Sequence, residues 1–215
     1  MTKLIEYLES FNRKERFFLI AQALGNPKFH LSEEFQASLS EAFGILVPGD
    51  AFVAMDYHID WIHSSLFLTF QGDEDTSIHP NTGNIATGNQ EDVDLLVAYE
   101  DGPLTHILLI EAKAETGWTN KQTLSKASRL RNIFGDEGTR YNQVRPHFCL
   151  MSPRVPSQLE SKRWPSWMTH GGEPLWIKLD VPAGRRKVTR CDEMGKSRAS
   201  GNFFKVVGGK EVGGS

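Results

Sequence analysis

The sequence predicts an α/β domain in which helices cover both faces of a central sheet. Residues 94–99 and 106–110 are apolar runs separated by the turn formers Glu100-Asp101-Gly102-Pro103, which is the pattern of a β-hairpin. Both runs are rich in Leu, Ile and Val with little polar alternation, which is typical of strands buried on both faces. Segments with amphipathic helical spacing precede and follow the hairpin and supply the covering elements.

Length and composition favour one globular domain. A chain of 215 residues can bury a core, and its hydrophobic fraction of 39% is ordinary. We expect a single domain over residues 1–215, with an N-terminal helical extension (1–29), a core (30–180), a C-terminal hairpin (184–207) and a tail (208–215).

Targeting features point to the cytoplasm. No apolar stretch is long enough to cross a bilayer, and the charged N-terminal residues differ from a secretory signal. The only cysteines, Cys149 and Cys191, form neither a disulfide framework nor a CxxC pair. We therefore expect a cytoplasmic protein without a membrane partner.

Charge is distributed unevenly along the chain. Residues 1–112 hold 5 Lys or Arg and 18 Asp or Glu, whereas residues 113–163 hold 10 and 4. This asymmetry favours one face for cations and another for an anionic polymer such as nucleic acid, although ordinary solvated surface explains it equally well.

Two helical segments precede the first strand. Residues 3–24 have amphipathic spacing with a break near Asn12, which is typical of packing helices. A second helix should begin after the N-cap Ser32 and run to about Phe43, where Gly44 ends it. Its carboxylates Glu34 and Glu41 lie on the flank of the buried arc, where one of them, Glu34 before Glu41, could reach a metal site; surface solvation is the alternative.

Residues 51–70 are ambiguous, because their pattern fits one or two strands or a strand followed by a short helix. In a single strand, Asp56, His58 and Asp60 would share one face. No zinc-ligand spacing accompanies them, so a zinc site here is disfavoured. Residues 71–92 are polar and aperiodic, and we expect a long loop that leads to Asp94.

A basic helix should follow the hairpin, from Asn120 to Phe134, with Gly135 at its end. Short apolar runs at 147–151 and 175–179 favour two further core strands, and the basic segment from Gly184 favours a second hairpin. Four polar side chains of the basic helix either contact phosphates or form a solvated cationic face: Lys121, Gln122, Lys126 and Arg129.

Charged residues gather at one end of the first hairpin. Glu111 and Lys113 point the same way because strand side chains alternate, and an antiparallel partner brings Asp94 beside them. The two carboxylates and the carbonyl of Ala112 form a hard oxygen site suited to Mg²⁺, with Mn²⁺ as a substitute. Such an ion activates water for phosphodiester hydrolysis, and the Lys113 ammonium could position that water or neutralise developing charge.

Asp94 followed by Glu111-Ala112-Lys113 after a hairpin resembles the PD-(D/E)xK nuclease superfamily. The resemblance covers about residues 30–150 and implies a restriction-endonuclease-like αβββαβ core, a central mixed β-sheet flanked by helices, to which the N-terminal helices and C-terminal hairpin are additions. It implies a Mg²⁺-dependent endodeoxyribonuclease whose helix acid is Glu34, and it matches Gln122 and Lys126 to a helix that faces the site. Val93 stands where the superfamily's proline would be.

These patterns are compatible with three functions. The first is a DNA nuclease with Glu34, Asp94, Glu111 and Lys113 as catalytic residues, for which a homodimer would suit cleavage of both strands. The second is an inactive nucleic-acid-binding or protein-interaction module on the same fold. The third is a plain α/β interaction domain in which Glu111 and Lys113 form a surface ion pair.

Overall fold

The computed structural model describes residues 3–12, 14–72, 75–89, 91–114, 117–182 and 184–208. The chain divides into two compact units, Met1–Lys178 and Leu179–Ser215, and each is described by itself. Most of the predicted tail lies outside the described residues, which end at Gly208.

The first unit contains a five-stranded sheet in the order β1-β2-β3-β4-β7. Strands β1, β2 and β3 pair antiparallel in succession, whereas β4 is parallel to both β3 and β7. The prediction of a mixed sheet flanked by helices is therefore confirmed. The strands are β1 (Phe52–His58), β2 (Asp92–Asp101), β3 (Leu104–Ala112), β4 (Val144–Ser152) and β7 (Trp176–Lys178).

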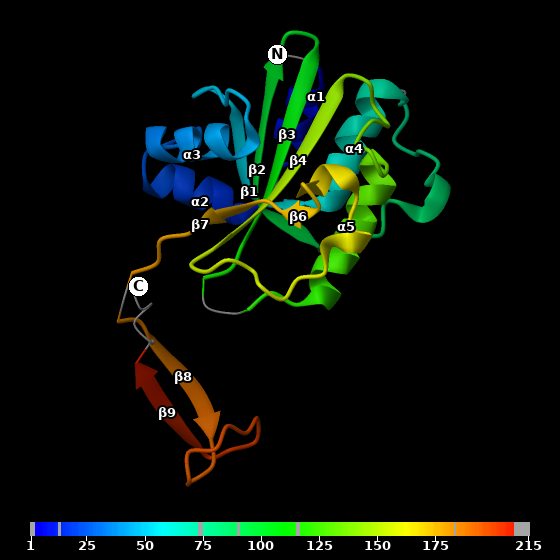
Figure 1. Ribbon diagram of the computed structural model, residues 1–215. Coiled ribbons are helices and arrows are strands. Elements are labelled where there is room, and N and C mark those ends of the chain that lie inside the picture. Colours follow the sequence, from blue (N-terminus) through cyan, green and yellow to red (C-terminus); the bar gives the residue numbers. More distant parts are fainter. Residues whose placement is uncertain are drawn as a thin grey trace. The chain divides into compact units, whose positions relative to one another are not determined.

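Five α-helices are described, and Figure 1 shows α2 and α3 on one side of the sheet and α4 and α5 on the other. In the described part of the chain, no helix has both the length and the apolar character to span a bilayer. The helices are α1 (Lys3–Phe11), α2 (Glu15–Ala23), α3 (Glu33–Phe43), α4 (Ile59–Phe70) and α5 (Asn120–Phe134). The short elements are 3-10 turns at Thr82–Asn84, Ser161–Arg163 and Ser166–Met168 and the paired strands β5 (Thr169–His170) and β6 (Glu173–Pro174).

Local sequence signals set several helix ends. The hydroxyl of Ser32 accepts a hydrogen bond from the backbone N–H of Phe35 at 3.2 Å and caps α3, which ends at Gly44 in the left-handed conformation (φ 66°). The predicted break near Asn12 separates α1 from α2. These features agree with the sequence prediction because each one depends on neighbours within a turn.

The main core lies between the sheet and the helices α1, α4 and α5. Alternate side chains of β3 and β4 enter it, and α5 covers them with an apolar face. Fully burying a leucine or isoleucine contributes roughly 2 kcal/mol, so this layer dominates the stability of the unit. The layer includes Leu8, Ile62, Leu66, Ile107, Leu109, Leu130, Ile133, Phe148 and Leu150. On the opposite face, α3 packs with Phe43 against His147 of β4, with ring centroids 5.3 Å apart.

In β1 and β2, the alternation of side chains between the two faces of the sheet is interrupted at neighbouring positions of the two strands. Ala54 and Tyr57 are three residues apart, yet both enter the core cluster, and Val93 and Leu96 do the same in the adjacent strand. Asp56 lies inside this break with a positive φ of 50°. The expected strand face shared by Asp56, His58 and Asp60 is wrong, because the break reorients β1 and helix α4 begins at Ile59.

The second unit is an antiparallel hairpin of β8 (Arg186–Cys191) and β9 (Phe203–Gly208), as the sequence predicts. Its apolar side chains are largely exposed, including Val188, Phe203, Phe204 and Val206. The segment that connects β8 to β9 passes so close to the end of β8 that a Cβ atom at Gly201 would overlap the carbonyl of Cys191.

Candidate functional site

The β2–β3 hairpin brings Asp94 and Glu111 together. Its register pairs Leu95 with Ile110, so Asp94 and Glu111 are the next residues across the ladder. The Asp94 carboxylate accepts a hydrogen bond from the backbone N–H of Ala112 at 2.6 Å. Asp94 is therefore held against the end of β3, where the antiparallel pattern predicted it.

Glu111 is a buried carboxyl, with 8% of the residue exposed. Burial raises its pKa to about 7, while the neighbouring Lys126 ammonium lowers it. The Asp94 carboxylate raises the pKa of Glu111 further, and the Lys113 ammonium opposes it. These effects define one group of charges at this end of the hairpin, containing two carboxylates and two ammonium groups.

Helix α5 supplies the cation that pairs with Glu111. The Lys126 ammonium donates to a Glu111 carboxylate oxygen and to the backbone carbonyl of Asp92, the latter at 2.6 Å. Only 12% of the Lys126 side chain is exposed. The sequence left the face of this lysine open, and in the structure its charge is bound among the carboxylates.

Lys113 follows the last residue of β3, and its backbone N–H donates to the carbonyl of Met151 at 2.8 Å. Its ammonium lies 6.0 Å from the centroid of the Trp118 ring, within range of a cation–π interaction. The Trp118 indole donates to the Ser152 hydroxyl at 3.2 Å, which fixes the ring. Lys113 is half-buried, and its ammonium acts on Glu111, as the shared strand face predicts.

The two helix acids considered from the sequence lie elsewhere. Glu34 and Glu41 are exposed on α3, which packs on the sheet face opposite to α5. Among the described residues, no hydrogen bond or ion pair joins either acid to Asp94 or Glu111. Glu34 lies in the first turn of α3, where the helix dipole favours a negative charge.

The four predicted phosphate contacts divide into two pairs. Lys121 and Gln122 are exposed, and the Gln122 amide accepts a hydrogen bond from the Thr119 hydroxyl at 3.1 Å. Arg129 is only 12% exposed and forms ion pairs with Asp60 and, at 3.1 Å, with Glu91. Arg129 and Lys126 thus form ion pairs with carboxylates of the fold itself. Of the four residues, Lys121 and Gln122 remain accessible to a polymer.

Sequence reasoning missed two further acids beside the site. The residues on either side of Asp56 in β1 pair with the residues on either side of Asp94 in β2, but Asp56 and Asp94 themselves are not paired in the ladder. Asp56 and Asp94 therefore lie at the same level on the two neighbouring strands. Asp56 forms an ion pair with Arg16, and Asp92 forms one with Lys14 at 2.7 Å. Asp92 could have been found from its position two residues before Asp94, whereas Asp56 depends on the break in β1.

The residues at the hairpin end suit a hard divalent cation. Asp94 and Glu111 each retain a second carboxylate oxygen beside the one that accepts a hydrogen bond, and the carbonyl of Ala112 adds a backbone oxygen donor. Over the described ranges, no group of three Asp, Glu, His or Cys side chains is arranged as a metal site. A cation here would therefore depend on two carboxylates, the backbone and water, as Mg²⁺ commonly does.

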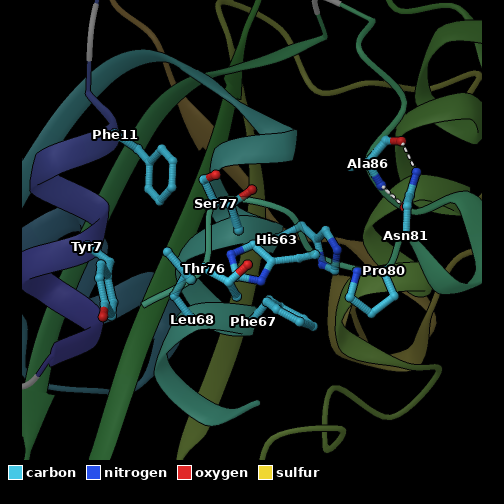
Figure 2. Close-up of a pocket in the computed structure, with 12 residues that line it drawn as sticks. Tyr7, Phe11, His63, Phe67, Leu68, Thr76, Ser77, Pro80, Asn81 and Ala86 are labelled. Carbon is cyan, nitrogen blue, oxygen red and sulfur yellow. Dashed lines mark hydrogen bonds between the residues drawn. The ribbon is translucent and has the colours of Figure 1, made fainter. Parts of the chain in front are cut away.

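A separate hollow of about 550 Å³ lies between α1, α4 and the loop after α4. Figure 2 shows the His63 ring in this hollow, with Phe67 and Leu68 from the same helix and Phe11 from α1 around it. Burial lowers the pKa of His63 and thereby favours the neutral ring. As far as the chain is described, the lining includes neither Asp94 nor Glu111.

Comparison of the chain with protein-family models, with curated proteins and with solved structures finds no match.

Proposed function

We propose that this protein is a Mg²⁺-dependent nuclease of PD-(D/E)xK type that hydrolyses phosphodiester bonds in DNA. The observation that carries the proposal is the convergence of Asp94, Glu111 and Lys113 at one end of the β2–β3 hairpin. The strand order and directions of β1 to β4, with α5 between β3 and β4, also suit the restriction-endonuclease-like core.

Each residue has a defined part in the proposed reaction. Asp94 and Glu111, with the Ala112 carbonyl, hold the ion, which when bound supplies Lewis-acid polarisation of a phosphoryl oxygen and a more acidic water. Lys113 places a positive charge beside the carboxylates, where it stabilises negative charge that develops on the phosphate. Lys126 compensates the charge of buried Glu111 and orients its carboxylate.

The C-terminal unit supports a nucleic-acid partner. Residues 184–208 contain seven Lys or Arg and two Asp or Glu, and the aromatic rings of Phe203 and Phe204 are exposed beside them. Cationic groups that attract phosphates, combined with exposed rings that stack on bases, are typical of surfaces that bind nucleic acid. Lys121 and Gln122 add accessible contacts on α5.

A reducing compartment fits this proposal. Cys149 and Cys191 are both free and buried, so neither needs an oxidising environment. We accordingly propose a cytoplasmic enzyme, and a homodimer would provide two such sites for cutting both strands of a duplex.

The test is nicking of supercoiled plasmid in Mg²⁺, with single-stranded DNA and RNA as further substrates. We expect wild-type protein to cleave, and Asp94→Asn, Glu111→Gln and Lys113→Met each to lose at least about 100-fold in rate. Glu34→Gln and its neighbour Glu33→Gln form a matched pair, because only the first lowers activity if Glu34 is the helix acid. An intact plasmid in both Mg²⁺ and Mn²⁺ would refute the nuclease assignment.

A second function is favoured by one specific contact. The Lys126–Glu111 ion pair already places a cation where a metal would otherwise compensate Glu111. On that basis the same fold would bind nucleic acid without cutting it. Gel-shift binding of DNA in EDTA, without cleavage when Mg²⁺ or Mn²⁺ is added, would establish this second function in place of the first.

A further inference from the structure

The β8–β9 hairpin of the second unit, labelled in Figure 1, has two faces of different composition. Residues that are directly paired in an antiparallel ladder point to the same face. One face, here called the arginine face, carries Arg186, Val188, Arg190, Phe204 and Val206. The other, here called the cysteine face, carries Lys187, Thr189, Cys191, Phe203, Lys205 and Val207. A partner that binds one face therefore meets different side chains from a partner that binds the other.

The loop between the two strands covers part of the cysteine face. The Lys205 ammonium donates a hydrogen bond to the carbonyl of Gly195 in this loop at 2.6 Å. Cys191 forms an isolated β-bridge with Ser197 of the loop, and only 2% of the cysteine is exposed. Within the second unit, the arginine face is therefore the more open of the two.

The arginine face exposes apolar side chains between two cations. Val188 is 66% exposed, Val206 is 50% exposed and Phe204 is 72% exposed. Arg186 and Arg190 lie on either side of Val188 along β8, and the two strands together contain four Lys or Arg and no Asp or Glu. Exposed apolar groups flanked by charge of one sign suit a partner that is anionic and also offers apolar area.

We infer that the arginine face binds unpaired bases of a DNA strand, with one base stacked on the ring of Phe204 and phosphates bound by the two arginines. Arg186 and Arg190 are four residues apart on one strand, about 14 Å at the rise of an extended strand, so they contact different phosphates. Arg190 donates its Nε–H to the carbonyl of Gly201 and keeps its other N–H donors. That the polymer is DNA rests on the proposed function, whereas the preference for unpaired bases follows from the face itself.

The apolar side chains of this face suit unpaired bases better than a duplex. The grooves of a duplex present the edges of the bases, which carry hydrogen-bond donors and acceptors. Val188, Val206 and Phe204 would remove water from those edges without replacing its hydrogen bonds, which is unfavourable. An unpaired base instead offers the flat surface of its ring, which stacks on an aromatic side chain without any hydrogen bond.

This preference is compatible with the plasmid test of the proposed nuclease. Negative supercoiling favours separation of the two strands, so a supercoiled plasmid offers unpaired bases beside duplex DNA. Binding itself needs no divalent ion and can be measured in EDTA, where no cleavage takes place. Tight strand binding without cleavage in Mg²⁺ or Mn²⁺ would refute only the nuclease, and cleavage without a preference for unpaired bases would refute only this inference.

The experiment is fluorescence anisotropy on the full chain in EDTA, with one labelled DNA strand used alone and annealed to its complement. We expect the single strand to bind at least about tenfold more tightly than the duplex. Phe204→Val should lose roughly tenfold in affinity for the single strand, because the ring is removed while a good strand former remains. Phe203→Val is the matched control on the cysteine face and should lose less than about twofold.

Two further measurements separate binding from folding. NMR amide signals of residues 184–208 should keep their dispersion in both valine variants, since each replaced ring is exposed. Arg186→Gln should reduce the slope of log affinity against log salt concentration by about 0.7, the value for one phosphate of a single strand.

Four results would each overturn the inference. They are equal or tighter binding of the duplex, undiminished strand binding by Phe204→Val, an equal loss in Phe203→Val and Phe204→Val, and an unchanged salt slope in Arg186→Gln. Vesicles that contain anionic lipid are the remaining arm, because they also combine negative charge with apolar area. Binding to these vesicles without binding to the single strand would assign the arginine face to a membrane surface instead.

Discussion

Glu111 illustrates how much a single side chain depends on its surroundings. Its carboxyl is buried, yet it lies beside the ammonium of Lys126 and the carboxylate of Asp94. Burial has the largest effect on its pKa, so the group titrates near neutral pH instead of near its usual 4.5. The stability of the fold, and the metal binding proposed above, should consequently change with pH in the physiological range.

Metal affinity should fall as the pH falls through about 7. A divalent ion competes with the proton on Glu111, and a group of pKa about 7 is about 90% ionised at pH 8 and about 10% ionised at pH 6. We expect Mn²⁺ to bind about tenfold more weakly at pH 6 than at pH 8 in calorimetry. Asp94→Asn is the control that should bind weakly at both values, and a pH-independent affinity of the wild type would contradict the prediction.

Removal of the Lys126 ammonium should destabilise the fold in a pH-dependent way. In Lys126→Met, Glu111 is a buried carboxylate without its partner, and breaking such a pair costs roughly 3 kcal/mol. Because the pKa of Glu111 in the folded protein is about 7 instead of 4.5, protonation of this carboxyl stabilises the fold at low pH, fully below about 4.5, and this stabilisation is lost as the pH rises through 7. The loss of stability caused by Lys126→Met should therefore be larger at pH 8 than at pH 5.5. Urea unfolding measures both values, and the exposed Lys121→Met on the same helix should unfold like wild type at each pH.

Among the elements, those with local end signals were the ones that the sequence could place. Helix α3 begins after Ser32 and ends before Gly44, and α5 ends at Gly135, each at the residue expected. The start of α4 at Ile59 could not be placed, because its apolar residues fit either a strand or a helix. Its N-terminus follows the break in β1, and the Nδ1 of His58 caps it by accepting a hydrogen bond from the backbone N–H of Asp60 at 3.1 Å, a local contact that the apolar pattern does not reveal.

The cap of α3 provides a test of the local signals. Ser32→Ala removes the hydroxyl that accepts from Phe35 N–H, and the loss of such a cap costs about 1 kcal/mol. Ser38→Ala changes the same residue type inside the same helix, where alanine is the better helix former, and should not destabilise. Thermal unfolding of the two variants should therefore differ in sign or size, and equal losses would contradict the capping role.

For the molecule as a whole, the sequence could predict the arrangement of the hairpin but not the packing of the helices against the sheet. The closeness of Asp94 and Glu111 is a consequence of antiparallel register, which the turn formers at residues 100–103 define. The pairing of Lys126 with Glu111 requires the rotation of α5 on the sheet, and the hollow around His63 requires the placement of α1 beside α4. Those arrangements depend on residues far apart in the chain, so a one-dimensional pattern does not contain them.

The division into two units predicts that a substitution that distorts one unit leaves the structure of the other unchanged. In Gly201→Ala, the added methyl group overlaps the Cys191 carbonyl, so the β8–β9 hairpin must distort. We expect NMR amide signals of residues 184–208 to shift or disappear, while those of the first unit remain in place. Gly208→Ala is the matched control, because its Cβ would meet no atom within 4 Å. Widespread shifts in the first unit would show that the two units depend on each other.

The positive φ of Asp56 has a consequence for evolution. Aspartate, asparagine and glycine adopt this conformation readily, whereas a β-branched residue there is strained. Among natural orthologues, position 56 should accordingly vary only among these three amino acids, even where other positions of the strand exchange valine, isoleucine and leucine.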